Sequence, residues 1–439
     1  MRRIAVIGSG VAGLAAAWRL SAPGMARRVT LFEADGHFGG HANTVDLCLD
    51  GVSHGVDTGF LVFNHRTYPL LTGLFQTLGV ETAPSEMSFS VQLPRADGRE
   101  GLEWSGSSLN TVFAQRRNLL RPHFWRLLGE ILRFNRLCTE LAQRGEEARL
   151  DGAIEDFLAE HRFDRNFQDH YLLPMVGCIW SCPTDQMLRF PIRTLIRFCH
   201  NHGLIQVSDR PQWHTVRGGS RQYVRLMLQR LGDARLNMPV LGVQRQARGA
   251  RVLTVQGAES FDAVVFACHT DQALSLLGDD ASPEERSLLG AIRYQANEAV
   301  LHTDASLLPR RRLAWAAWNY ERSADAGRER AQVCLHYLLN RLQPLPWARP
   351  VIVSLNPARP IDETLVHRRI GYAHPVFDRA ALAAQGRLSS LQGQRDTWFC
   401  GAWSGYGFHE DGLRSGLAAA DAVEAALARR DAIGEQGVA

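Results

Sequence analysis

The sequence contains no lysine, and all 49 residues of the combined lysine and arginine count are arginines. Without a side-chain amine the protein can neither form a Schiff base nor use the lysine of a phosphate-binding loop. Long apolar runs are also missing, because no stretch of about 18 uninterrupted apolar residues occurs, as a membrane-spanning helix requires. Gly8, Gly10 and Gly13 interrupt the apolar N-terminus, which therefore does not predict a secretion signal. The absence of a secretion signal and of a membrane-spanning run predicts a cytoplasmic protein.

Cysteine is scarce and irregularly spaced, with eight residues in 439. A disulfide framework needs regular pairs in a short secreted chain, so none is predicted. Cys178 and Cys182 lie one helical turn apart in apolar surroundings, which favours buried thiols over a redox or metal pair. His200 and His202 alternate as strand neighbours do, but no third ligand at suitable spacing accompanies them, so no metal site is predicted. The net charge of +4 is too small and too dispersed to indicate nucleic acid binding.

The N-terminal residues have the pattern of a dinucleotide-binding unit. Residues 3–7 form a β-branched run that ends in the glycine turn 8–13, and an apolar helical pattern follows. A second apolar run over 29–32 ends in Glu33, 20 residues after the third glycine. Strand, glycine turn, helix, strand and acid in this order predict a Rossmann-type site.

Each residue of this unit has a physical role. Gly8 permits a tight turn, Gly10 lets the backbone approach a pyrophosphate, and Gly13 lets the helix pack closely on the strand. The helix start presents free N–H groups and the positive end of its dipole to the phosphates. Glu33 can accept hydrogen bonds from the ribose hydroxyls and would repel a 2′-phosphate.

A second glycine pair favours a flavin over a nicotinamide cofactor. Gly39 and Gly40 follow Glu33, and Asp57–Phe60 come next. The longer FAD must pass a further stretch of backbone, which a nicotinamide cofactor does not. In this arrangement the sequence resembles the flavin-containing amine oxidase superfamily, which includes monoamine oxidase, protoporphyrinogen oxidase and phytoene desaturase. That family has an arginine after the glycine pair, where this chain has His41. The resemblance implies FAD held without a covalent link.

The resemblance returns in two later segments. Residues 216–220 open a helical stretch that strands follow, and in the family the position of Val240 contacts the adenine side through its backbone. Residues 400–419 place glycines around a helix start whose N–H groups would face the flavin ring, where the dipole would stabilise the negative charge of the reduced flavin. The residues expected to bind the cofactor are Gly8, Gly10, Val11, Ala12, Gly13, Glu33, Ala34, Gly39, Gly40, His41, Thr58, Gly59, Phe60, Val240, Gly401, Ala402, Asp411, Gly412 and Leu413.

Within the superfamily, residues 405–412 most resemble a bacterial branch that is associated with the formation of cyclopropane and methylated fatty acids. Residues 180–181, 190–191, 201–203 and 374–377 also resemble that branch. This resemblance implies a lipid or another apolar small molecule as substrate.

The chain is long enough for two domains, and 45% apolar and 21% charged residues allow each a full core. We expect an α/β fold in which a discontinuous Rossmann-type FAD-binding domain carries a mixed α+β substrate domain with a helical cap. The expected FAD-binding segments are 1–83, 209–277 and 395–430, the substrate-binding segments are 84–208 and 278–394, and 431–439 form a C-terminal tail.

Residues 116–137 combine arginines with an apolar face that starts at Pro122. A basic amphipathic helix of this kind can lie on an anionic bilayer surface and admit a lipid. A cap helix packed on the substrate domain would show the same pattern. The sequence thus leaves open whether the protein contacts the inner face of the membrane.

The missing lysine also bears on the chemistry. Amine oxidases of the superfamily usually place a lysine, through a water, at flavin N5, and this chain has none. This favours hydride transfer to N5 from an acyl chain of a fatty acid or phospholipid. Near the flavin-facing helix, His409 and Glu410 are the candidate bases, and His409 could shuttle the second proton at a near-neutral pKa. Tyr406 is expected to face the flavin ring.

Two alternatives remain open. One is an amine or polyene oxidase of the same superfamily. A short, polar pocket lined by acids would favour amine oxidation, whereas the acyl-chain hypothesis predicts a deep apolar tunnel. A non-catalytic flavin-binding partner of a lipid-modifying enzyme would keep the cofactor and lose the chemistry, with side chains blocking the flavin face.

Overall fold

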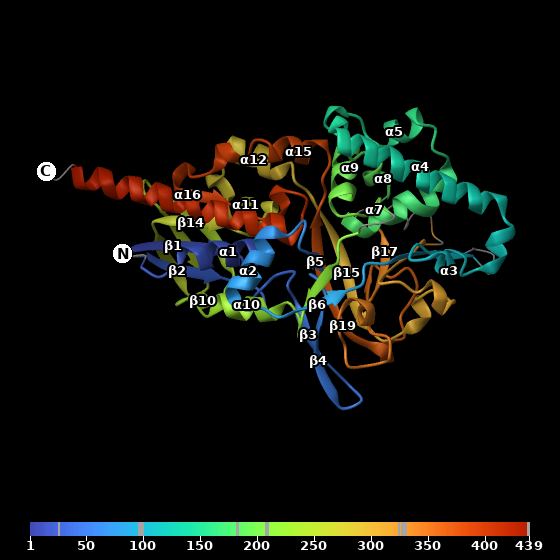
Figure 1. The fold of residues 1–439 in the computed structure, drawn as a ribbon. Coiled ribbons are helices and arrows are strands. Elements are labelled where there is room, and N and C mark those ends of the chain that lie inside the picture. Colours follow the sequence, from blue (N-terminus) through green and yellow to red (C-terminus); the bar gives the residue numbers. More distant parts are fainter. Residues whose placement is uncertain are drawn as a thin grey trace.

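The computed structural model of this chain describes residues 1–24, 27–94, 101–180, 184–206, 210–323, 325 and 332–436. Two large sheets organise the fold, one in each half of the molecule (Figure 1). Both termini lie at one end of the molecule, beside the first sheet. The helices within residues 109–201 lie at the other end, above the second sheet.

The first sheet has five parallel strands in the order β10-β2-β1-β14-β20. Its strands are β1 (Arg2–Ile7), β2 (Arg27–Phe32), β10 (Ala234–Arg235), β14 (Ala263–Phe266) and β20 (Thr397–Phe399). Successive side chains of a strand point to opposite faces, and both faces of this sheet are covered. Ile4 and Val6 pack with α1 (Val11–Leu20) on one side, whereas Ala5 and Ile7 pack with α11 (Thr270–Leu277) on the other.

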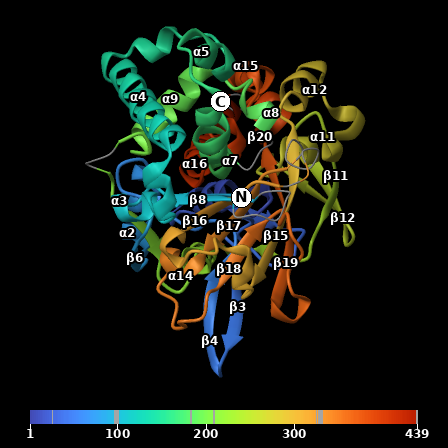
Figure 2. The same ribbon diagram turned by 90° about the vertical axis from the view of Figure 1, so that its right-hand side faces the viewer.

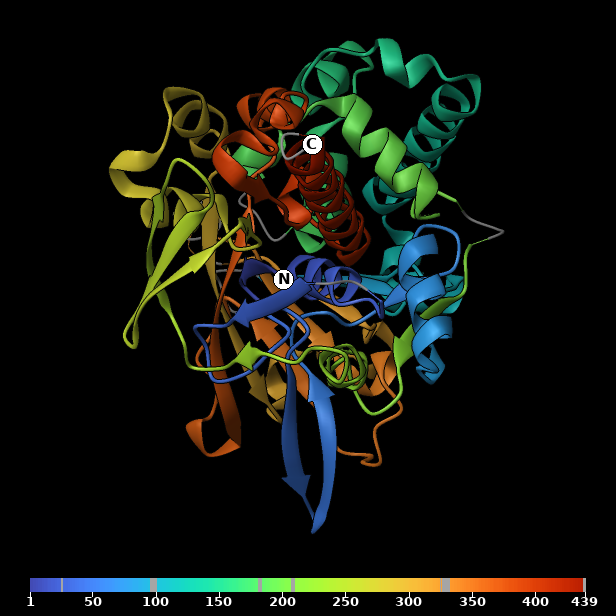
Figure 3. The same cartoon turned by 90° about the vertical axis from the view of Figure 1, so that its left-hand side faces the viewer.

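Helix α16 (His409–Gln436) lies alongside α1, as Figures 1 and 3 show. Two glycines of α16 allow the close contact: a Cβ on Gly416 would lie 2.1 Å from the carbonyl oxygen of Ala12, and one on Gly412 would lie 2.6 Å from Cγ1 of Val11. The start of α16 therefore lies directly beside the start of α1, although about 400 residues separate them in the chain.

The second sheet has seven strands in the order β19-β15-β18-β17-β16-β7-β8. They are β7 (Phe89–Leu93), β8 (Leu102–Ser105), β15 (Tyr294–His302), β16 (Trp318–Glu321), β17 (Cys334–Leu338), β18 (Ile352–Leu355) and β19 (Val366–Pro375). Neighbours are antiparallel except β7 and β16, which pair in parallel. This parallel pair joins residues 84–208 and 278–394, which we call the first and second inserts, into one sheet.

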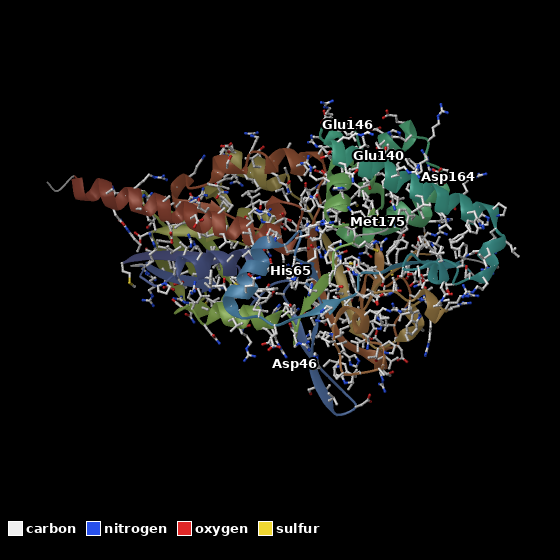
Figure 4. All side chains as sticks on the ribbon, in the orientation of Figure 1. Asp46, His65, Glu140, Glu146, Asp164 and Met175 are labelled. Carbon is white, nitrogen blue, oxygen red and sulfur yellow. The ribbon has the colours of Figure 1, made fainter. Side chains whose placement is uncertain are left out.

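Helices lie over one side of the second sheet (Figure 2). They are α3 (Leu109–Val112), η1 (Arg116–Leu120), α4 (Pro122–Arg144), α5 (Ile154–Glu160), α6 (Arg165–Phe167), α7 (Leu173–Trp180), α8 (Thr184–Met187) and α9 (Ile192–Asn201). Helix α4 begins at Pro122, as the sequence predicts, because proline lacks the N–H that a first-turn residue leaves unpaired. Figure 4 shows Glu140, Glu146 and Asp164 on the outer side of this layer and Met175 on its inner side. The layer is amphipathic, with its apolar face toward the sheet.

Smaller elements connect the two halves. They are the hairpin of β3 (Thr44–Leu49) and β4 (Val52–Asp57), the sheet of β5 (Phe63–Asn64), β6 (Thr82–Ser85) and β9 (Trp213–Val216), the meander of β11 (Val240–Arg245), β12 (Ala250–Thr254) and β13 (Gly257–Phe261), and the helices α2 (Pro69–Leu78), α10 (Arg221–Leu228), α12 (Pro283–Gly290), α14 (Leu339–Leu342) and α15 (Arg379–Gln385). The helix after residues 216–220 and the strands after it confirm the local predictions.

Two expectations need correction. Residues 278–394 were assigned to the substrate domain, but Leu289 of α12 and Ala381 of α15 pack in the core of the first sheet. Together with α11, these two helices cover the face of the first sheet opposite α1. His200 is in helix α9 and His202 ends it, so the two histidines are not strand neighbours. Cys178 is buried, as expected, and Cys182 lies outside the described residues.

The contribution of the contact between α1 and α16 to stability can be tested by a substitution that adds one methyl group. Gly416→Ala would push a Cβ into the Ala12 carbonyl, so we expect a loss of more than about 2 kcal/mol in the free energy of unfolding, together with loss of bound flavin. Gly73→Ala in α2 is the matched control, since a Cβ there meets nothing within 4 Å. That control should gain about 0.5–1 kcal/mol from helix propensity. Thermal unfolding and the flavin-to-protein absorbance ratio report both effects, and equal behaviour of the two variants would contradict the packing role.

Candidate active site

A single cavity of about 2120 Å³ runs between the two halves. Pockets for drug-sized ligands are about 300–1,000 Å³, so this one has room for a dinucleotide and a second molecule. One end of the cavity is formed by the glycine turn after β1 and by Glu33. The other end is formed by the second sheet and by the helices above it.

The glycine turn positions the cofactor end. Gly8 has a φ of +99°, a conformation that side chains disfavour, and a Cβ on Gly13 would lie 1.9 Å from the Gly8 carbonyl oxygen. A Cβ on Gly10 would meet nothing within 4 Å, because Gly10 borders the cavity. Gly8 and Gly13 are thus closely packed against the protein, whereas Gly10 faces the cavity, next to the N–H groups that start α1. This is the cradle that a pyrophosphate requires.

Glu33 lies buried at the end of β2, beside the glycine turn. Its Oε2 accepts hydrogen bonds from the backbone N–H of Ser9 at 3.0 Å and from the Ser9 hydroxyl. Its Oε1 accepts one from the N–H of Asp35 at 2.9 Å. The carboxylate is therefore oriented at the cavity wall, where the sequence pattern places the ribose hydroxyls. Ser9 is a member of the site that the glycine pattern alone does not single out.

His41 tests whether the residues of this site fit a bound cofactor. Its Nε2 is buried and has no hydrogen-bond partner among the described residues, yet the side chain borders the cavity. Its ring stacks on Tyr372 with centroids 4.7 Å apart and meets His374 edge-on at 5.2 Å. Burial, together with neighbouring histidines, lowers its pKa well below the usual value. A neutral ring with one unpaired nitrogen fits contact with a bound polar group, so the donor set accommodates FAD.

The C-terminal segment completes the wall. Gly401 and Ala402 line the cavity, as do Tyr406 and His409. The loop between them is held by Asp411, whose Oδ2 accepts hydrogen bonds from the N–H groups of Tyr406 and Phe408, both at 3.1 Å. The two helix starts that the sequence predicts to converge on one cofactor do lie on the same cavity.

Most of the residues expected to bind the cofactor line this cavity. They are Gly8, Gly10, Val11, Ala12, Glu33, Ala34, Gly39, Gly40, His41, Gly59, Phe60, Val240, Gly401 and Ala402. The other five expected residues do not line the cavity but support the residues that do. Gly13 and Gly412 allow close packing, Leu413 is in the core, Asp411 holds the loop, and the Thr58 hydroxyl bonds to the Asn43 carbonyl at 3.0 Å and to the Tyr372 hydroxyl at 2.9 Å.

The two candidate bases differ from expectation. Glu410 does not line the cavity, and its carboxylate accepts hydrogen bonds from the N–H groups of Leu70 and Leu71 at 2.9 and 3.0 Å, which caps α2. It is a capping residue in this structure rather than a base. His409 does line the cavity, but burial lowers its pKa to about 3 instead of leaving it near neutral. Its ring stacks on Phe60 at 3.7 Å, and its Nε2 lies 3.1 Å from the Tyr223 hydroxyl.

The far end of the cavity is apolar and aromatic. Its described lining residues are contributed by α4, the π-helical turn Gln168–Leu172, α7 and α9 above and by the second sheet below, and include Leu128, Ile131, Tyr171, Met175, Ile179, Trp180, Phe198, Trp318 and Tyr337. The carboxylates among the described lining residues are Glu33, Asp35 and Asp271, all at the cofactor end. The far end therefore offers no described carboxylate to a cationic ligand.

Sequence reasoning missed the residue that ties the halves together. Asp57 is buried at the end of β4 and accepts hydrogen bonds from the Ser220 N–H at 2.9 Å, from the Gln343 side-chain amide at 2.8 Å and from the Thr44 hydroxyl at 2.6 Å. Burial nevertheless raises its pKa to about 6. Gln343 follows α14 in the second insert, so its partnership with Asp57 carries no signal in either segment alone.

Comparison with known proteins gives the family. The sequence model described as flavin containing amine oxidoreductase matches residues 11–306, which is more than half of the chain. The chain belongs to this family. It is an FAD-dependent oxidoreductase of the amine oxidase superfamily, with an α/β fold in which a parallel sheet is covered by helices.

The individual proteins that this chain resembles are distant from it in sequence. Protoporphyrinogen oxidase 2 of Arabidopsis thaliana is 27% identical over 198 residues, which span 42% of this chain and only 34% of that protein. Putrescine oxidase with bound putrescine has a TM-score of 0.65 at 16% identity, and the match covers 97% of this chain and 99% of the other. The CLA-producing fatty acid isomerase of P. acnes has a TM-score of 0.65 at 15% identity, with 95% and 97% covered. At these identities the structural matches establish the fold.

Alanine substitutions at two glycines of the turn separate an effect on cofactor binding from an effect on folding. Gly10→Ala places a methyl group in open space, so we expect a folded protein whose FAD dissociation constant rises about tenfold or more because the methyl occupies the pyrophosphate position. Gly13→Ala meets the Gly8 carbonyl, so it should lower the unfolding temperature as well. Flavin fluorescence titration and thermal unfolding measure the two effects. Unchanged FAD affinity in Gly10→Ala would contradict this placement of the cofactor.

The cavity histidines predict a stability that falls in mild acid. Burial lowers the pKa of His374 to about 4 and that of His409 to about 3, so the unfolded chain, with histidine near 6.5, binds protons that the folded chain does not. The free energy of unfolding should therefore fall as the pH drops from about 6.5 toward 4, by on the order of 1 kcal/mol for each histidine by pH 5.

Asp57 acts in the opposite direction, since its raised pKa favours the folded state as the pH falls through about 6. Single variants therefore isolate the histidines. Denaturant unfolding at pH 7 and pH 5 should show a smaller difference for His374→Gln and His409→Gln than for the parent protein. His123→Gln, at an exposed position, should leave the difference unchanged. If both cavity variants showed the same difference in the free energy of unfolding between pH 7 and pH 5 as the parent protein, the two histidines would not be its cause.

Proposed function

We propose that this flavoenzyme dehydrogenates an acyl chain of a fatty acid or phospholipid. The single observation that carries the proposal is the far end of the cavity, which is long, aromatic and apolar and has no carboxylate among its described lining residues. An ammonium group buried there would lack a counter-charge, at a cost of several kcal/mol. A hydrocarbon chain requires none and gains about 0.8 kcal/mol for each buried methylene.

Two further observations support an acyl substrate. The chain contains no lysine to stand at flavin N5, where amine oxidases of the superfamily usually have one. In addition, one protein with the same fold is named a fatty acid isomerase, although others are amine oxidases. The shared fold accommodates both substrate classes, so the lining of the cavity discriminates better than the fold does.

The residues of the site have distinct roles in this proposal. When bound, FAD supplies a hydride acceptor at N5. Glu33 and the glycine turn orient the dinucleotide. Leu128 and its apolar neighbours exclude water from the chain and hold it extended. The proton that leaves with the hydride requires an acceptor, and the neutral imidazoles that line the cavity, His374 and His409 among them, are the groups at the wall that can accept it.

Anaerobic reduction of the bound flavin tests the substrate class. Detergent-dispersed long-chain fatty acids and phospholipids should bleach the visible flavin absorbance, whereas putrescine and short monoamines should not. Mass spectrometry should then find a product two hydrogen atoms lighter than the fatty acid. Bleaching by amines alone would replace the proposal with amine oxidation, and bleaching by neither class would favour a non-catalytic flavoprotein.

Two leucines of α4 give a matched pair of variants. Leu128 lines the cavity, whereas Leu137, on the same helix and also half-buried, does not. Leu128→Trp should block the chain and lower kcat/KM for long-chain substrates about tenfold or more. Leu137→Trp should leave it near the parent value, with the same flavin content. An equal effect of both substitutions would show that the cavity is not the path of the substrate.

A further inference from the structure

An unusual cluster of exposed apolar side chains lies at the start of the helical layer. Five of the eleven large apolar side chains that are exposed in the described residues fall within 109–132: Leu109 (79% exposed), Leu119 (46%), Leu120 (88%), Trp125 (50%) and Leu132 (54%). They come from α3, η1 and α4, and we call them the leucine edge. Figure 1 shows these elements at the end of the molecule opposite the termini. Clustered exposed apolar groups of this kind mark an interaction surface.

Arginine dominates the charge around the leucine edge. Residues 109–132 contain four arginines and one acid, Glu130, which forms an ion pair with Arg133. Arg126 is exposed next to Trp125 and forms no ion pair with any described residue, and Arg136 likewise has none. Helical spacing places Trp125, Leu132 and Arg136 on the same exposed face of α4. Apolar side chains beside two exposed arginines, Arg126 and Arg136, complement an anionic bilayer, where leucine and tryptophan enter the acyl region and arginine binds headgroup phosphates.

The leucine edge is continuous with the substrate cavity. Leu109 and Leu132 are exposed, and both also line the cavity, as do Val112 and Leu128 just behind them. The cavity thus opens between α3 and α4, and its rim consists of the same side chains that form the exposed cluster. An apolar molecule that passed this rim would move from one apolar environment to another without crossing water.

We propose that the leucine edge docks on an anionic bilayer and that the opening between α3 and α4 admits the acyl chain directly from it. The inference rests on the proposed function, since a docked entrance serves a substrate that dissolves in lipid. No described helix is long and apolar enough to cross a membrane, so the contact is one of partial insertion from one side. Leu120, the most exposed of the five side chains, would enter the bilayer first together with Leu119, its neighbour in η1.

Vesicle flotation with the FAD-loaded full chain tests docking without any turnover. The protein should float with vesicles of equal parts phosphatidylglycerol and phosphatidylcholine, bind pure phosphatidylcholine weakly, and dissociate as salt rises. Leu119→Ser with Leu120→Ser should weaken binding by about tenfold or more, and Arg126→Gln by about fivefold. The exposed pair Leu241→Ser and Val255→Ser, on the other half of the molecule, should leave binding unchanged.

Flavin spectra and reduction by detergent-dispersed substrate should match the parent in all these variants, because the substituted side chains are exposed. Parent-like flotation of the Leu119→Ser, Leu120→Ser protein would overturn the proposal. So would light scattering that shows a dimer in the parent and a monomer in this variant, since the edge would then pair two copies of the chain. Failure of substrates to bleach the flavin, with flotation intact, would reject the proposed function and leave the docking surface in place.

Discussion

The contact of α1 with α16 is the constraint on which the cofactor site depends. A glycine at position 416 lets the helix approach the Ala12 carbonyl closely, and Gly412 lets its first turn lie against Val11. Since the two helices start at this contact, their free N–H groups and dipole ends border one cavity. Any side chain at either glycine would move α16 outward and separate the two parts of the site. The cavity is thus a consequence of helix packing rather than of the loops alone.

The second constraint is the way the substrate half is attached. Its sheet is completed by the parallel pair of β7 and β16, which belong to different inserts, so neither insert can form the sheet alone. Asp57 then links the hairpin β3–β4 to the start of α10 and to Gln343 of the second insert. These bonds are buried, and a carboxylate left without them would be costly. The relative position of cofactor end and apolar end is therefore held by interactions within the core.

The chemical character of the cavity changes along its length. At the cofactor end, an oriented carboxylate and backbone N–H groups supply polar contacts, whereas the far end supplies aromatic and aliphatic surface. Between them His41, His374 and His409 are kept neutral by burial. Neutral rings at this position can accept or donate a hydrogen bond without placing a charge beside the apolar end of the cavity. The same lining continues outward to the exposed side chains of the leucine edge.

Local sequence determined the parts of this protein whose physics is local. The glycine turn, the first strand and helix, Glu33 and the Pro122 helix start follow from steric and capping rules that act over a few residues. FAD as cofactor was predicted from the second glycine pair, Gly39 and Gly40, together with the family resemblance. Tertiary structure decided what depends on contacts between distant segments. It assigned Glu410 to the cap of α2, lowered the pKa of His409 by burial, placed α12 and α15 against the first sheet, and joined Asp57 to Gln343. Burial and partners across the fold decide whether a polar residue is available for chemistry, and residue spacing in a single chain does not encode them.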